Sequence, residues 1–202
     1  MKKCINVLLI LIVATACRSS KSGESYGMVI NPISDEIKKD IQIIKLKKST
    51  GVIFPSGYES NLTGNQSKSN RFTPSIEEVK NAEIEIQKQY LEANRRFVYE
   101  QVYTRNKQIY GDQKINKQKE YSDIMKWVVI EAKRLPKFDR QYIGYIENGE
   151  KKLFIIFIDF SKDPYNLKKQ LTKSVIFGWH GWFSSNVRME KYNMNTKVLS
   201  VH

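Results

Sequence analysis

The chain has 202 residues and a formal net charge of +13 at pH 7, from 34 basic and 21 acidic residues. This length supports one domain with a substantial core and is too short for two comfortable ones. The positive charge favours anionic partners, but a soluble, lysine-rich surface is the simpler explanation, so charge alone assigns no function.

Residues 1–17 have the order of a secretory signal: charged, then apolar, then small. Lys2 and Lys3 come first, the run Ile5–Val13 follows and is apolar except for Asn6, and Ala14–Ala16 precede Cys17. The apolar run is about half of the ~20 residues that a membrane-spanning helix needs, which is typical of a cleaved signal. A cysteine at the cleavage point indicates a lipobox. We therefore expect cleavage after residue 16 and lipid on the thiol of Cys17.

Processing at that position has three consequences. It leaves 186 residues with a net charge of +11, because Lys2 and Lys3 depart with residues 1–16. It discards Cys4 and modifies Cys17, so no thiol is left for a disulfide or a metal site. If the signal is cut elsewhere, Cys17 is open to an intermolecular disulfide. Export to an envelope membrane, inner or outer, also argues against nucleic acid as the partner of this basic chain.

The segment before residue 72 is expected to contain little regular structure. Residues 17–25 are polar and have the composition of a flexible tether. Within the irregular segment 26–71, Ser34–Ile37 fits one helical turn, Ile41–Leu46 fits a short strand and Val52–Phe54 fits an edge strand. The folded domain is expected to span residues 72–202.

Two helices are expected in that domain. The first is expected from about 74 to 97. Thr73 can cap this helix, and Pro74 fits its first turn. Its apolar residues recur at steps of three and four: Ile76, Val79, Ala82, Ile86, Tyr90, Ala93 and Phe97. A second helix is expected from about Ser122 to the residue before Pro136. Its expected inner face consists of Ile124, Trp127, Val128 and Leu135.

Asn148–Gly149 is the strongest turn signal, because this pair readily adopts the positive φ angles of a type I′ turn. It predicts a hairpin of residues 141–147 and 150–160, in which Glu147 pairs with Glu150 and Ile143 with Phe154. Both faces of the hairpin are apolar, so its second strand is expected inside the sheet.

The rest of the chain completes an α+β fold. Leu167 and Leu171 fit a short helical turn, and strands are expected at 175–183, 186–192 and 197–201. This order of elements predicts one or two N-terminal helices packed on a four- to five-stranded antiparallel meander.

The sequence lacks the common catalytic patterns, such as G-x-S-x-G, S-x-x-K and the glycine-rich phosphate-binding motifs. His180 and His202 have no partner at metal-site spacing, so neither a metal nor another cofactor is predicted. Asp159 is the best-placed acid, but a single carboxylate makes no acid–base pair. An exposed position at the end of a strand is its simpler interpretation.

The candidate binding residues lie in one aromatic segment, Phe177, Gly178, Trp179, His180, Gly181 and Trp182. Glycines in a strand let a ligand or another backbone approach closely, or mark a bulge, and aromatic rings beside them can line a pocket. The alternative is that these rings belong to the core and the glycines relieve crowding.

Three features carry a resemblance to small uncharacterised lipoproteins of Bacteroidetes-type bacteria. Thr73–Pro74 opens a helix, Arg140–Ile146 opens a hairpin, and the Asn-rich turn Asn193–Asn195 precedes the last strand. The likeness covers the signal and roughly residues 72–202, and it implies no activity or catalytic residue. A helix-on-sheet module of the cystatin or NTF2-like kind would accommodate the same elements, by fold-level analogy.

These features favour a non-enzymatic binding module of the cell envelope, anchored to a membrane by lipid at Cys17. Its partner would be an envelope protein, a glycan or a lipid. The alternative is a lipid-anchored hydrolase that uses scattered acids such as Asp159. A third possibility is that the basic surface itself binds anionic membranes, which predicts salt-sensitive adhesion.

Overall fold

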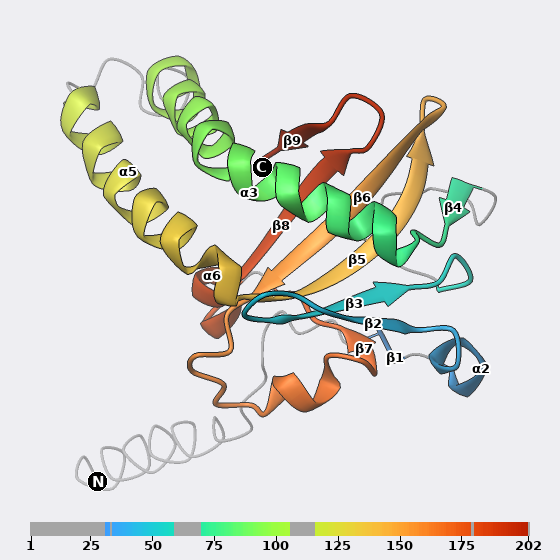
Figure 1. The fold of residues 1–202 in the computed structure, drawn as a ribbon. Coiled ribbons are helices and arrows are strands. Elements are labelled where there is room, and N and C mark those ends of the chain that lie inside the picture. The colour runs from blue at the N-terminus through green and yellow to red at the C-terminus, as the bar shows by residue number, and fades with distance from the viewer. Residues whose placement is uncertain (1–30, 33, 59–69, 106–115, 179, 202) are drawn as a thin grey trace, which may run out of the picture.

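The structure is a computed structural model that describes residues 31–32, 34–58, 70–105, 116–178 and 180–201 (Figure 1). It confirms the α+β class. The helices are α2 (Asp35–Lys38), α3 (Ile76–Tyr99), α5 (Lys117–Arg134) and α6 (Trp182–Asn186). A π-helical stretch, Glu100–Arg105, continues α3, and short 3-10 turns occupy Leu135–Lys137 and Leu167–Gln170.

Seven strands form one mixed sheet: β2 (Gln42–Lys45), β3 (Thr50–Phe54), β4 (Arg71–Phe72), β5 (Asp139–Glu147), β6 (Glu150–Ile158), β8 (Val187–Asn193) and β9 (Val198–Ser200). Their order is β2-β3-β5-β6-β8-β9, and β4 pairs with the same edge of β5 as β3. Among these seven described strands, β3 and β5 are the one parallel pair, because the chain between them crosses over through α3 and α5. A separate pair joins β1 (Asn31–Pro32) to β7 (Ser174–Val175).

The expected four- to five-stranded antiparallel meander agrees only roughly with the structure: β5, β6, β8 and β9 follow one another antiparallel, but they belong to a larger, mixed sheet. Strands β2 and β3 come from the segment before residue 72, so the expected boundary of the folded domain leaves out two strands of the sheet. β3 is an interior strand and not the edge strand expected at Val52–Phe54, because β5 pairs with its far side. That partner lies far along the chain, where local sequence patterns cannot reveal it.

The β5–β6 hairpin has the predicted register, with Glu147 opposite Glu150 and Ile143 opposite Phe154. Asn148 and Gly149 adopt φ angles of 55° and 77°, as the type I′ turn requires. Strand β6 lies between β5 and β8, inside the sheet, which confirms the prediction from its two apolar faces.

Helix α3 begins with a capping box, in which Ser75 accepts a hydrogen bond from the Glu78 amide and the Glu78 carboxylate accepts one from the Ser75 amide. The cap is therefore Ser75 rather than the expected Thr73. Most of the predicted apolar stripe is buried against the sheet: Val79, Ala82, Ile86, Tyr90 and Ala93.

A second apolar cluster covers the opposite face of the sheet. Its sheet residues include Ile143, Phe154 and Ile156, and residues 167–183 supply much of its cover. The strand expected at 175–183 is therefore wrong, because only Ser174–Val175 form a strand and residues 182–186 form α6. Ile176 and Phe177 are buried in this cluster, so the apolar run covers the sheet and does not extend it.

A buried ion pair ties α3 to the sheet. Arg140 Nε lies 3.0 Å from Glu83 Oε1, and both side chains are almost fully buried. The Tyr142 hydroxyl donates to the same carboxylate oxygen at 2.7 Å, and burial raises the pKa of Tyr142 well above its usual value. The arginine also donates to Ser49 Oγ and to the backbone carbonyls of Phe138 and Leu135. Because every charge has partners, this network fixes the helix on the sheet.

Candidate binding groove

The structure places the residues of the aromatic segment in different environments, some buried and some exposed. Phe177 is 7 % exposed and Gly178 is buried, so neither is accessible to a partner. His180 and Gly181 are exposed, and Gly181 adopts a φ of 59°, which turns the chain into α6. Trp179, like Cys17, lies outside the described residues.

Trp182 is a packing residue at the start of α6. Its ring stacks on Phe160 at a centroid distance of 6.1 Å and meets Phe183 edge-on at 5.3 Å. Its indole N–H donates to the backbone carbonyl of Lys162. These contacts leave Trp182 half-buried, and it packs against the apolar cluster that contains Phe177 and Phe183.

A groove of about 540 Å³ opens beside this segment, between α5 and α6. Trp127, Ile130 and Arg134 of α5 form one wall. Ser184, Ser185 and Asn186 of α6 line it as well, together with Ser161 and Lys162 from the turn after β6. In Figure 1 the C-terminal end of α5 lies beside α6, whereas its N-terminal end leans away from the sheet.

Trp127 is the most exposed large apolar side chain in the described structure, with 73 % of its surface accessible. The sequence pattern placed Trp127 and Ile124 on the inner face of the helix, and this is wrong. The helix begins at Lys117, capped by the Asn116 side chain, five residues before the expected start at Ser122. Its inner side is instead a half-buried stripe of Tyr121, Met125, Val128, Val129 and Ala132.

That stripe also has helical spacing and is the signal that could have identified the correct face. Two overlapping apolar stripes exist in this helix, and periodicity alone does not decide between them. The choice depends on α3, which packs against α5 and whose Tyr99 meets Tyr121 of the half-buried stripe edge-on.

An ion pair and a hydrogen bond hold Glu131 and Arg188, two charged residues of the groove lining. Arg188 Nη2 lies 2.8 Å from Glu131 Oε2, and the Tyr90 hydroxyl donates to the other carboxylate oxygen at 2.5 Å. Burial and the neighbouring Glu131 raise the pKa of Tyr90 far above its usual value, so the hydroxyl remains a neutral donor. The positions of Glu131 and Arg188 are therefore set before any partner binds.

Asp159, the acid considered for hydrolysis, has a structural role on the same side of the molecule. Its carboxylate pairs with Arg134 and accepts a hydrogen bond from the Ser161 amide at 2.9 Å. The side chain is 8 % exposed. These contacts fix the turn that follows β6, and they give the hydrolase alternative no support.

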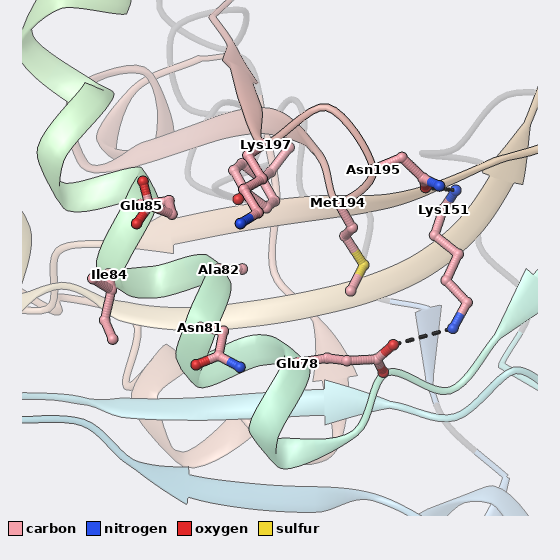
Figure 2. Close-up of a pocket in the computed structure, with 10 residues that line it drawn as sticks. Glu78, Asn81, Ala82, Ile84, Glu85, Lys151, Met194, Asn195 and Lys197 are labelled. Atoms are coloured by element: carbon pink, nitrogen blue, oxygen red, sulfur yellow. Dashed lines mark hydrogen bonds and ion pairs between the residues drawn. The ribbon is translucent and has the colours of Figure 1, made fainter.

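A second hollow, of about 460 Å³, lies between α3 and the β8–β9 turn (Figure 2). Lys151 joins its two sides through an ion pair of 3.1 Å with Glu78. The hydrogen bond from the Ser75 amide, assisted by Lys151, lowers the pKa of Glu78. Asn195 accepts from the Lys151 amide at 2.8 Å. Since these polar groups hold secondary structure together, the groove beside α5 is the better candidate site.

Within the described ranges, no three His, Cys, Asp or Glu side chains gather closely enough to hold a metal ion. The helices in those ranges also include none that is both long and apolar enough to span a membrane. Comparison with protein-family models, with curated proteins and with solved structures gives no match to this chain.

Proposed function

We propose that this protein is a non-enzymatic binding module of the bacterial cell envelope, anchored by lipid at Cys17, and that the groove between α5 and α6 receives its partner. One observation carries the assignment of the site. Trp127 stands 73 % exposed in the wall of a groove in which an ion pair fixes the positions of Glu131 and Arg188. Exposed tryptophans beside preformed polar groups are typical of binding surfaces.

The anchor is supported by the sequence of residues 1–17, and the binding role by the placement of the aromatic residues. A long helix across one face of an antiparallel meander is also an arrangement that cystatin and NTF2-like modules share, which fits a binding role by fold-level analogy alone. The resemblance to Bacteroidetes-type lipoproteins is part of the same proposal.

The anchor is tested by labelling cells with a radioactive fatty acid. Wild-type protein should take up the label and Cys17→Ser should not, because the lipobox cysteine carries the acyl chains. Label that persists in Cys17→Ser, with normal export of that variant, contradicts the anchor.

The groove is tested by site-specific photo-cross-linking in cells. A photoreactive amino acid at Ser185, which lines the groove, should yield a defined adduct. The matched control is Ser122, an exposed serine of α5 outside the groove lining. Equal yields from the two positions, or none from Ser185, would show that the groove is not the binding site.

A further inference from the structure

We propose that the partner of this groove is the anionic surface of the bilayer to which the chain is anchored. The outer face of α5 would lie at the headgroup level, with Trp127 entering the interface and the cations of the groove binding lipid phosphates. This inference rests on the proposed lipid anchor and names the partner of the same site.

Helix α5 carries an apolar outer face that the described structure leaves uncovered. Ile124, Trp127 and Ile130 recur at steps of three residues and are 36 %, 73 % and 46 % exposed. None of the 18 residues of α5 is buried, whereas a helix of a globular domain ordinarily buries one stripe. Tryptophan is enriched at membrane interfaces, because its ring is apolar and its N–H needs a polar partner.

The charges around this face are complementary to anionic lipid. Arg134, Lys162 and Arg188 line the groove together with one acid, Glu131, which Arg188 already neutralises. Two exposed lysines, Lys126 and Lys133, lie farther round the helix from Trp127. This is the pattern of an interfacial helix, in which basic side chains flank an apolar centre.

Three acids qualify this pattern without reversing it, and one of them, Glu120, lies about two helical turns before Trp127 on the same side of α5. Asp159 takes up part of the charge of Arg134, and Asp123, on the outer side of α5, is paired with Lys126 at 2.8 Å. Lys133 and Lys162 are exposed, and each basic group near an anionic leaflet favours binding by about fivefold, the ratio that corresponds to about 1 kcal/mol.

The length of chain before the described structure allows this contact. Fourteen residue steps separate Cys17 from Asn31, and a chain of that length reaches at most about 50 Å. A domain held this close to the bilayer experiences a high effective concentration of lipid, so a weak surface contact is sufficient for docking. The anchor and the α5 face would then act together, as two signals for stable membrane association.

The experiment uses the full lipidated protein in vesicles that contain brominated lipids, which quench tryptophan fluorescence on contact. Emission from Trp127 is the difference between wild type and Trp127→Phe. In vesicles rich in phosphatidylglycerol this difference should fall by half or more, and in neutral phosphatidylcholine vesicles it should change little. A control variant, Trp127→Phe with Ile43→Trp, moves an exposed tryptophan to β2, where Ile43 is 55 % exposed, and should show little quenching. Replacing Lys133 and Lys162 by glutamine should raise the fraction of anionic lipid needed for half-maximal quenching.

Failure of the docking is distinguishable from failure of the anchor. Protein that floats with the vesicles while Trp127 remains unquenched keeps the anchor and overturns the docking. Equal quenching in neutral and anionic vesicles overturns the role of lipid charge. A protein adduct in place of a lipid adduct from position 185 also overturns this inference, although the proposed binding function would stand.

Discussion

Trp127 and Trp182 are the same residue type on two neighbouring helices, yet they occupy opposite environments. Trp182 is held between Phe160 and Phe183 and donates to a backbone carbonyl, whereas Trp127 is 73 % exposed. The sequence pattern placed Trp127 on the inner face of its helix and made Trp182 a candidate binding residue, with a place in the core as the alternative. A tryptophan is equally suited to packing and to binding, so residue type does not decide its role. Its role is decided by the elements that pack against it.

The largest effect is expected inside the aromatic segment. Phe177 is 7 % exposed in the cluster that covers the sheet, so Phe177→Ala should lower the free energy of unfolding by about 3–5 kcal/mol, through lost burial and a cavity. Chemical denaturation monitored by circular dichroism measures this loss. A change below about 1 kcal/mol would show that the segment is not part of the core and would return it to the candidate binding sites.

The two tryptophans can then be compared directly. Trp182→Ala should cost about 2 kcal/mol, because it removes two ring contacts and a hydrogen bond from a half-buried position. The matched variant Trp127→Ala should change the free energy of unfolding by no more than about 0.5 kcal/mol, as is usual for exposed positions. Similar losses for the two variants would contradict the exposed position of Trp127.

A smaller effect is expected at alkaline pH, where buried tyrosines begin to ionise. Burial and Glu131 raise the pKa of Tyr90, and burial raises the pKa of Tyr145 to about 12. The pKa of a tyrosine in the unfolded chain is about 10. When folding raises that pKa, the hydroxyl contributes fully to the free energy of unfolding below about pH 10. This contribution is lost as the pH rises from there through the pKa of the folded state. The free energy of unfolding should therefore be constant from about pH 7 to about pH 10 and should decrease above about pH 10.

Tyr90→Phe tests the contribution of this hydroxyl. It should cost about 1 kcal/mol at neutral pH, for the lost hydrogen bond to Glu131. The free energy of unfolding of the variant should also fall less steeply with pH above about pH 10. The slope should differ by up to about 1.4 kcal/mol per pH unit, which is the contribution of one titrating group. Urea denaturation across the alkaline range measures both effects. The same alkaline slope in wild type and variant would mean that Tyr90 is not kept neutral by its surroundings.

Several elements could be predicted because a local rule was sufficient. The β5–β6 hairpin followed from Asn148–Gly149 and the period of two, which together fix its register. The buried stripe of α3 followed from the spacing of its apolar residues at steps of three and four. The helical turn at Leu167 and the strands β8 and β9 were also found where the sequence placed them.

Other features depend on contacts between distant parts of the chain. The parallel pairing of β3 with β5 joins segments separated by both long helices, and no local pattern specifies it. The candidate groove combines residues of α5, α6, β8 and the turn after β6. Its serines, lysine and arginines form no motif in the sequence, so only their position in the fold identifies them.

The sequence by itself determined the α+β class, the two faces of the central hairpin and the buried side of α3, because hydrophobic periodicity and turn chemistry act over a few residues. It also carries the whole case for a lipid anchor at Cys17, which stays a prediction. Only the tertiary structure decided which apolar stripe of α5 meets α3, and that residues 176–177 cover the sheet without extending it. The reason is physical: burial is a property of pairs of surfaces, and the second surface lies elsewhere in the chain.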